Sequence, residues 1–253
     1  MSLIIGICIL PIIALQLTVS WSQWAERKAQ IGDLAIHQAE LLAGDAGSIA
    51  EGARLLLGAA AEFHQVRTRG AECNLRLAAI RRNAPGFLFI ALVDGSGGIY
   101  CTSDGSVHAA DAKAAWIQAA REVTGFVAGR FARSDEYPGG FLPFYFPVAN
   151  NGGLGDHPTL VAALDLSWVG QHLRQLTQRS SAFLRVAELT VADADGVILA
   201  RSVQHDEFVG QKFPSAAMPV VQAAQPGILR LKSIDATERV VGFVPPGPAT
   251  HNL

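Results

Sequence analysis

The chain has 253 residues, of which 50% are hydrophobic, and it carries a formal net charge of −2 with a pI of about 6.4. This length allows two small domains or one large domain, and the apolar share argues against a disordered chain. Because the overall charge lacks the basic surplus that nucleic-acid binding needs, the composition predicts no nucleic-acid partner.

The N-terminal segment is the most apolar part of the sequence. It contains no Asp, Glu, Lys or Arg before Glu26, and Trp21 and Trp24 follow the apolar run. A run of this length is close to what a bilayer-spanning helix requires, and tryptophans are common where such a helix leaves the membrane. A buried core helix or a cleaved signal peptide are the alternatives, but the run lacks the basic start and small-residue cleavage site of a signal peptide. We predict a transmembrane anchor at 1–21 in the plasma (inner) membrane, with the rest of the chain in the periplasm or extracellular space. The charges after the run leave its orientation open.

A long amphipathic helix is predicted at 22–70. This stretch contains no proline, and its apolar residues recur mostly at three- and four-residue steps, as in a heptad-like helical stripe. The stripe consists of Ile31, Ala35, Leu42, Ala46, Ile49, Ala53, Leu56, Ala60 and Phe63. It either packs along its own domain or pairs with a second copy of the helix, and the second arrangement predicts a homodimer.

Three cysteines are present, and Cys8 lies within the apolar run. Cys73 and Cys101 lie 28 positions apart in the part predicted to be exported. Two cysteines in an exported domain suggest one disulfide, with two buried thiols as the alternative. No CxxC or HxxxH spacing accompanies them, so we predict no metal site.

Two segments repeat the same pattern. "FIALVDGSGGIYCTS" begins at Phe89 and "ELTVADADGVILARS" begins at Glu188, an offset of 99 positions. Each predicts a hairpin whose turn is Asp-x-x-Gly, because Asp accepts backbone N–H bonds and Gly allows a positive φ. The offset places Asp94 on Asp193, and it predicts two related α+β domains that share one long helix.

Other elements are predicted around these hairpins. The first hairpin follows a helix at 72–83, and a second helix is predicted at 111–123. Strands are predicted in "GFVAGRFA", "FLPFYFPVAN" and "PTLVAALDL", a helix in "SWVGQHLRQLTQ", a short helix in "PSAAMPVVQAAQ", and a last hairpin from "GILRLKSID" and "ERVVGFVPPG".

The segment "CNLRLAAIRRNAPGFLFIALVDGSGGIYCTS" resembles the Cys-x-x-Leu, Pro, apolar strand, Asp-x-x-Gly and Cys-x-Ser element of double Cache (dCACHE) sensor regions. These regions are the extracytoplasmic parts of bacterial membrane signalling receptors. "GVILARS" with "FVGQKF" is similar to the corresponding part of their second domain, so the resemblance covers about residues 4–247. It implies two tandem PAS-like domains with antiparallel sheets, a membrane-distal one at 71–178 and a membrane-proximal one at 179–253 whose truncation is left open. It also implies that Cys73 and Cys101 join the end of the long-helix region to the first hairpin.

The resemblance also implies a ligand pocket in the first domain. Amino-acid-binding members use aromatic residues, an Arg for the ligand carboxylate and an Asp for the ligand amine, which suits the charges of both partners. Asp165 stands where the pocket Asp would stand, and Arg130, Phe131 and Tyr145 are the other candidates. The Tyr and Trp that surround the Arg in those members are absent here. A solvated position for Arg130 and a core position for Tyr145 are the alternatives.

No sequence signature of an enzyme accompanies this pattern: GxSxG, P-loop and HExxH motifs are absent, as is a dinucleotide-binding context for the glycines. We therefore predict a non-enzymatic sensor without a cofactor. It binds a small molecule in the first domain and signals through the long helix to a diguanylate cyclase or histidine kinase that we expect to be missing from this chain. The alternatives are a membrane-anchored hydrolase that uses Asp94, His108 and Asp111, and a structural or adaptor module that binds no ligand.

Overall fold

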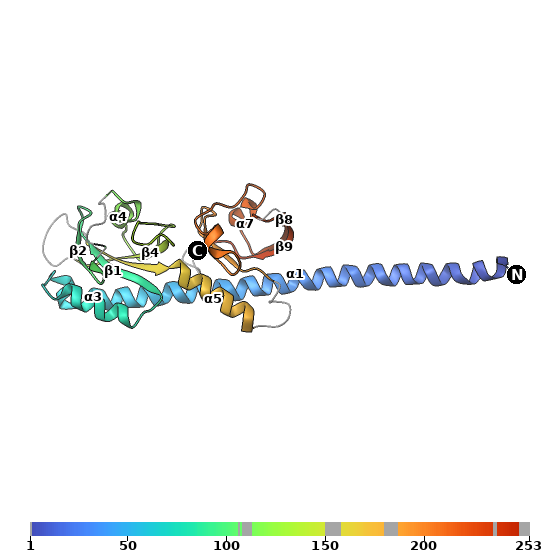
Figure 1. Ribbon diagram of the computed structural model, residues 1–253, viewed down its shortest axis with the longest axis horizontal. Coiled ribbons are helices and arrows are strands. Elements are labelled where there is room, and N and C mark those ends of the chain that lie inside the picture. The colour runs from blue at the N-terminus through green and yellow to red at the C-terminus, as the bar shows by residue number, and fades with distance from the viewer. Residues whose placement is uncertain are drawn as a thin grey trace.

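The computed structural model describes residues 2–105, 107, 113–149, 158–179, 187–234 and 237–247. Its helices are α1 (Ser2–Glu62), α2 (His64–Arg67), α3 (Cys73–Arg82), α4 (Ala115–Ala120), α5 (Leu166–Arg179), α6 (His205–Phe208) and α7 (Met218–Gln222). Its strands are β1 (Phe87–Val93), β2 (Ile99–Thr102), β3 (Val127–Ala128), β4 (Phe141–Pro147), β5 (Thr159–Asp165), β6 (Thr190–Ala192), β7 (Ile198–Arg201), β8 (Gly227–Lys232) and β9 (Glu238–Phe243). Figure 1 shows two units of strands side by side along α1, whose N-terminal part extends beyond them. The predicted α+β class with a long N-terminal helix is confirmed.

The sequence predicts an anchor at 1–21 from which a long amphipathic helix continues over 22–70. In the structure, α1 is one continuous helix of 61 residues from Ser2 to Glu62. It ends at Glu62 because the backbone of Phe63 is extended, with φ −67° and ψ 129°. The Phe63 ring packs against the core, and the Arg76 guanidinium lies 5.3 Å from its centroid. Over the described ranges, no helix has both the length and the apolar character that a membrane crossing needs.

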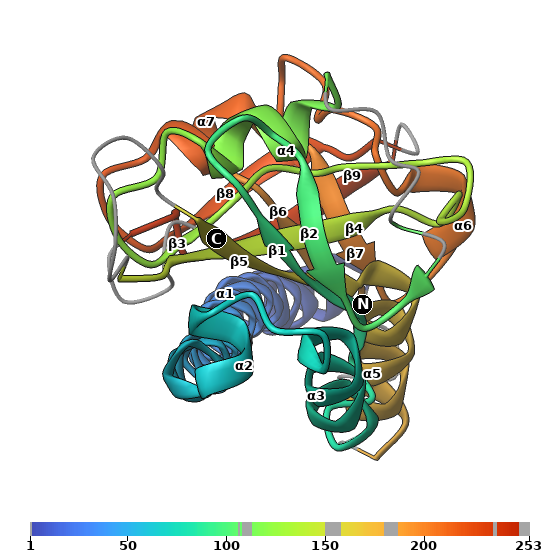
Figure 2. The same cartoon turned by 90° about the vertical axis from the view of Figure 1, so that its left-hand side faces the viewer.

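The first unit contains a five-stranded antiparallel sheet in the order β2-β1-β5-β4-β3. Successive side chains of a strand point to opposite faces, so Ile90 and Leu92 enter one core while Phe89 and Ala91 enter another. The first core lies between the sheet and α1, where Ala50, Ala53, Leu57 and Ala60 are fully buried. Figure 2 shows α1, α3 and α5 below the sheet and α4 above it.

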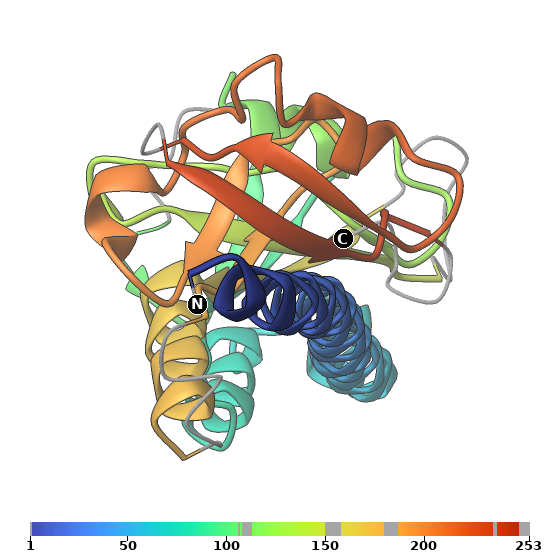
Figure 3. The same cartoon turned by 90° about the vertical axis from the view of Figure 1, so that its right-hand side faces the viewer.

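The second unit is smaller and consists of two separate hairpins, β6-β7 and β8-β9. Strand β9 packs on α1, and Figure 3 shows the β8-β9 hairpin lying across this helix. The contact depends on Gly242, because a Cβ at this position would lie 2.3 Å from the carbonyl carbon of Ala35. A glycine inside a strand often marks such a close approach of two backbones.

The repeat predicted from the sequence is present as two hairpins of the same geometry. In β1-β2, Ala91, Leu92 and Val93 pair with Thr102, Cys101 and Ile99; in β6-β7, Thr190, Val191 and Ala192 pair with Arg201, Ala200 and Ile198. Every residue of the second set follows its counterpart by 99 positions, and the register shifts at the same place in both hairpins. The turn glycines Gly97 and Gly196 have φ of 91° and 77°, as the predicted turn requires.

Cys73 and Cys101 form a disulfide, which confirms the predicted pairing. Cys73 is the first residue of α3 and Cys101 lies in β2, and both side chains are buried. The bond therefore joins the segment after α1 to the first hairpin, as the resemblance implies.

Candidate functional site

Tyr145, a predicted pocket residue, lies inside the core of the first unit that is on the α4 side of the sheet. Its side chain is 2% exposed and packs in the same cluster as Phe89, Trp116 and Phe141. The Tyr145 hydroxyl donates a hydrogen bond of 2.9 Å to the carbonyl oxygen of Trp116. Burial raises the pKa of this phenol well above its ordinary value, so the hydroxyl stays protonated and acts as a donor.

Arg130 and Phe131 lie at the joint between the two units. The Arg130 side chain is 73% exposed and forms an ion pair with Asp195 in the turn of the second hairpin. The Phe131 ring lies between Gly140 of the first unit and Gly210 of the second, where an added Cβ would lie 2.5 Å and 2.7 Å from the ring. The ion pair and the packing of the Phe131 ring therefore join the first unit to the second.

Asp165 is the last residue of β5 and caps α5. Its Oδ1 accepts a hydrogen bond of 2.8 Å from the backbone N–H of Ser167, the second residue of the helix. A side-chain oxygen that binds this N–H is the usual N-cap contact, so it accounts for an aspartate here without a ligand.

The four predicted residues thus have different partners: a core carbonyl, a carboxylate of the second unit, two glycines, and a helix N-terminus. Of the residues proposed for a hydrolase, Asp94 is the turn residue of the first hairpin, where its Oδ1 accepts backbone N–H bonds from Ser96 and Gly98, both at 2.8 Å. His108 and Asp111 lie outside the described residues.

A cavity of about 480 Å³ lies in the second unit, within the size range of small-molecule pockets. One wall is α1 between Ile31 and Ala46, and the others are the hairpins β6-β7 and β8-β9 with the α7 region. The N-terminal half of the predicted apolar stripe therefore lines this cavity, while its C-terminal half packs under the first sheet. Most of the lining side chains are aliphatic, among them Leu42, Leu189, Val191, Val221 and Leu231.

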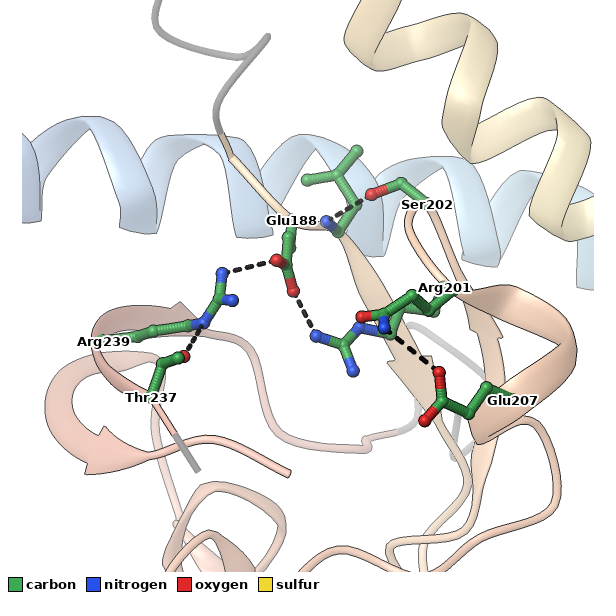
Figure 4. A network of polar contacts seen from close by, with 8 residues as sticks. Glu188, Arg201, Ser202, Glu207, Thr237 and Arg239 are labelled. Carbon is green, nitrogen blue, oxygen red and sulfur yellow. Dashed lines mark hydrogen bonds and ion pairs between the residues drawn. The ribbon is translucent and has the colours of Figure 1, made fainter. Parts of the chain in front are cut away.

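Three charged side chains form a cluster in the wall of this cavity. Glu188 lies between two arginines: it accepts a hydrogen bond from Nη2 of Arg201, and its Oε1 lies 2.7 Å from Nη1 of Arg239 (Figure 4). The Arg201 side chain is only 2% exposed, and its guanidinium lies 4.5 Å from the Phe208 ring centroid. Arg239 also donates from Nε to the Thr237 hydroxyl at 2.7 Å. We call these three residues the Glu188 cluster.

Asp193 is another carboxylate in the lining of the cavity, but its oxygens accept backbone N–H groups, two of them in its own hairpin turn. Its Oδ1 accepts N–H bonds from Asp195 at 3.0 Å and from Val197 at 2.9 Å, and its Oδ2 lies 3.5 Å from the backbone nitrogen of Phe131. It therefore shapes the hairpin and the joint with the first unit. Among the described residues there is no group of three or more His, Cys, Asp or Glu side chains that could hold a metal ion.

The sequence pattern alone does not indicate the Glu188 cluster as a site. Glu188 and Arg201 lie at the ends of the second repeated segment, and Arg201 follows three apolar residues in β7. A charged residue at the strand position that Thr102 occupies in the first hairpin is the one sequence signal that could have indicated it. The position of Arg239 depends on how the β8-β9 hairpin packs, which the local pattern does not encode.

Neither a protein-family model nor a curated protein sequence matches the chain. Solved structures do match it. The extracellular domain of a protein assigned as histidine kinase rpHK1S-Z16 has a TM-score of 0.66 at 17% identity, covering 87% of this chain and 89% of that one. The periplasmic sensory domain of the Campylobacter jejuni chemoreceptor Tlp1 has 0.63 at 12%, covering 85% and 90%. The ligand-binding domain of the Pseudomonas fluorescens chemoreceptor CtaA, solved with L-isoleucine, has 0.57 at 14%, covering 86% and 87%.

The chain shares its fold with these sensory domains of other proteins. At these identities the likeness concerns the fold, and it agrees with the Cache-type architecture predicted from the sequence. The cavity beside the Glu188 cluster lies in the second unit, whereas the residues predicted from the sequence lie in the first unit and at the contact between the two units.

Proposed function

We propose that this chain is the extracytoplasmic ligand-sensing region of a signal-transduction receptor. The observation that carries the proposal is that α1 belongs to both units: it packs under the first sheet and forms a wall of the cavity in the second. A molecule bound in the cavity contacts the element that also supports the other unit. The structural neighbours, which include sensory domains of chemoreceptors, support this role.

A shift in the packing of β9 on α1 is the proposed signal. At Gly242 the backbone of β9 lies directly against that of α1, where an added Cβ would be 2.3 Å from the carbonyl carbon of Ala35, so a movement of the hairpin changes this contact. A ligand shifts such an equilibrium only by its difference in affinity for the two packings. The cavity provides this difference, because its volume depends on the distance between the hairpins and the helix.

Membrane attachment, dimerisation and output are further parts of the proposal. The apolar composition of residues 1–21 supports an anchor there. Leu34, Leu41 and Leu55 are 43%, 53% and 58% exposed on α1, and they follow seven- and fourteen-residue steps. Such a row supports pairing with a second copy of α1. The proposed output is a histidine kinase or a diguanylate cyclase.

The test is a thermal-shift screen of the chain against amino acids, organic acids, amines and purines. A ligand present at one hundred times its Kd stabilises the folded state by about 2.7 kcal/mol, which raises the melting temperature by several degrees. The variant Ala39→Phe fills the cavity from α1, and Leu41→Phe adds the same ring to an exposed position of the same helix. We expect the shift to vanish in the first variant and to persist in the second.

The same screen tests the site predicted in the first unit. Asp165→Asn removes the charge of Asp165 but keeps an oxygen that caps α5. A shift that persists in Ala39→Phe and vanishes in Asp165→Asn assigns the ligand to the first unit. If no compound shifts a folded chain, the sensing function is wrong and a structural or adaptor role takes its place.

A further inference from the structure

We infer that the cavity of the second unit binds an uncharged molecule with an apolar body and one hydroxyl or carbonyl group, which forms a hydrogen bond with Gln38 of α1. This inference rests on the proposed function, and it adds the chemical class of the ligand and a residue that recognises it. It concerns the second unit rather than the first-unit pocket implied by the resemblance.

The apolar body of the ligand follows from the cavity walls. Most of the lining residues are aliphatic, and they come from α1, β6, α7 and β9, as with Leu42, Val191, Val221 and Val241. Burial of apolar surface against such walls is the main force that holds a small molecule in a pocket. A molecule made only of polar groups would lose its hydrogen bonds to water here, which is costly.

The lining contains four charged side chains, and each contacts another group of the protein. Glu188 contacts both Arg201 and Arg239 (Figure 4). Arg239 also donates a hydrogen bond of 2.7 Å to the Thr237 hydroxyl, and Asp193 accepts two backbone N–H groups of its own turn. The charged groups beside the cavity are therefore bound to one another or to the backbone.

A charged ligand would have to compete with these contacts. A carboxylate would compete with Glu188 for the arginines, and an ammonium would compete with the arginines for Glu188 or with the turn for Asp193. Either ligand would also lose its hydration on entering an aliphatic cavity, and this loss costs far more for an ion than for a hydroxyl. An uncharged ligand avoids both costs.

Gln38 is the polar residue in the wall that α1 contributes. The other six α1 residues of this wall are Ile, Leu or Ala, and the Gln38 side chain is partly buried among them. A carboxamide both donates and accepts hydrogen bonds, so it suits a hydroxyl or a carbonyl group. An apolar molecule without such a group would remove water from this carboxamide and give no hydrogen bond in return, which is costly.

The two parts of the ligand would contact different elements. Its hydroxyl or carbonyl group binds α1 at Gln38, and its apolar body packs on the hairpins β6-β7 and β8-β9. Gln38 lies about one helical turn from Ala35, the residue that Gly242 of β9 faces. A ligand held in this way bridges the helix and the hairpins, so its binding acts on the contact between β9 and α1.

The test uses isothermal titration of the full chain with octan-1-ol and 3-phenylpropan-1-ol, each beside the acid and the amine that carry the same apolar body. Propylbenzene is the matched hydrocarbon, and geraniol and menthol add further neutral shapes. All of these compounds also join the thermal-shift screen of the proposed function. We expect at least one alcohol to bind, and we expect no acid or amine to bind as tightly as the alcohol with the same body.

Gln38→Leu should weaken binding of that alcohol by about two- to tenfold, the effect of losing one neutral hydrogen bond. Its affinity for propylbenzene should not fall. Gln30→Leu is the matched control, since it makes the same substitution on the same helix at an exposed residue outside the lining. It should change the affinity by less than about twofold. Gln and Leu have similar helix propensities, and a melting curve verifies that each variant is folded.

Three results overturn the inference: no alcohol binds, the acid or amine binds as tightly as the alcohol with the same body, or Gln38→Leu binds the alcohol like the unmodified chain. The cavity itself is tested by Ala39→Phe, and an alcohol that binds this variant unchanged also overturns the inference. If a charged compound of the widened screen binds, is lost in Ala39→Phe and is kept in Leu41→Phe, the sensing function stands and the chemical class is wrong. If no compound of any kind binds, both are wrong.

Discussion

Asp193 makes in the second hairpin the contacts that Asp94 makes in the first. Oδ1 of Asp94 accepts the N–H groups of Ser96 and Gly98, and Oδ1 of Asp193 accepts those of Asp195 and Val197. The two turns differ in their surroundings, because Asp193 is 4% exposed and also faces the backbone nitrogen of Phe131 across the joint between the units. The same local motif therefore supports a hairpin in one unit and an inter-unit contact in the other.

Asp193→Ala should destabilise the chain by about 1–3 kcal/mol, because it leaves buried N–H groups of the turn without their acceptor. Urea unfolding measures this loss. Asp193→Asn keeps an acceptor in an Asx turn and should cost much less. Amide hydrogen exchange at Phe131 should rise in Asp193→Ala and not in Asp94→Ala. Equal exchange in both variants would show that Asp193 does not hold the joint.

Gly242→Ala should separate the β8-β9 hairpin from α1, because its Cβ would lie 2.3 Å from the carbonyl carbon of Ala35. Backbone atoms cannot move aside as a flexible side chain can, so we expect a lower melting temperature and faster amide exchange along β9. Gly52→Ala is the matched control: a Cβ there meets nothing within 4 Å, and alanine favours the helix by up to about 1 kcal/mol. A melting temperature unchanged in Gly242→Ala would contradict this packing.

Reduction of the Cys73–Cys101 disulfide should lower the free energy of unfolding by about 3.5 kcal/mol, the chain-entropy effect for a closed loop with a sequence separation of 28 residues. Urea unfolding of the chain with and without a reductant measures it. The double variant Cys73→Ala, Cys101→Ala should match the reduced chain and be insensitive to the reductant. A double variant as stable as the oxidised chain would show that the packing of α3 on β2 holds these elements together without any stabilisation by the disulfide.

His205 should make stability depend on pH. Its side chain is 5% exposed, and Nδ1 accepts the backbone N–H of Arg201 at 3.3 Å. Burial lowers the pKa of His205 below its ordinary 6.5, because desolvation of the imidazolium outweighs the attraction of Asp206. Between the lowered pKa and 6.5 the unfolded chain binds more protons than the folded chain, so the free energy of unfolding rises with pH. The stability is fully present above this window and declines as the pH falls through it.

Urea unfolding at a series of pH values checks the slope. In His205→Gln the part of the slope within the window should disappear. The same substitution at His37, whose side chain is 64% exposed on α1, controls for the loss of an imidazole. A slope that persists unchanged in His205→Gln would assign the pH dependence to other groups.

Much of the fold could be predicted because it depends on contacts between residues that are close in the sequence. The turn of each hairpin is formed by contacts between Asp94 or Asp193 and residues at most four positions away, so the Asp-x-x-Gly pattern indicates it directly. The apolar stripe of α1 needs only helical periodicity to be recognised. The pairing of Cys73 with Cys101 followed from the resemblance, and the structure confirms it.

The site was less predictable because its residues meet only after the hairpins pack on α1. Glu188, Arg201 and Arg239 come from three segments, and no local pattern states that Arg201 is buried or that Arg239 faces Glu188. Asp165 and Tyr145 were chosen by position, but their contacts are a helix cap and a core carbonyl. The sequence by itself determined the repeated hairpins, the long helix and a net charge close to zero, because these depend on contacts within a few residues or on composition. Only the tertiary structure decided where the cavity lies and which charges line it, because the distance between β9 and α1 depends on packing between residues as far apart as Ala35 and Gly242.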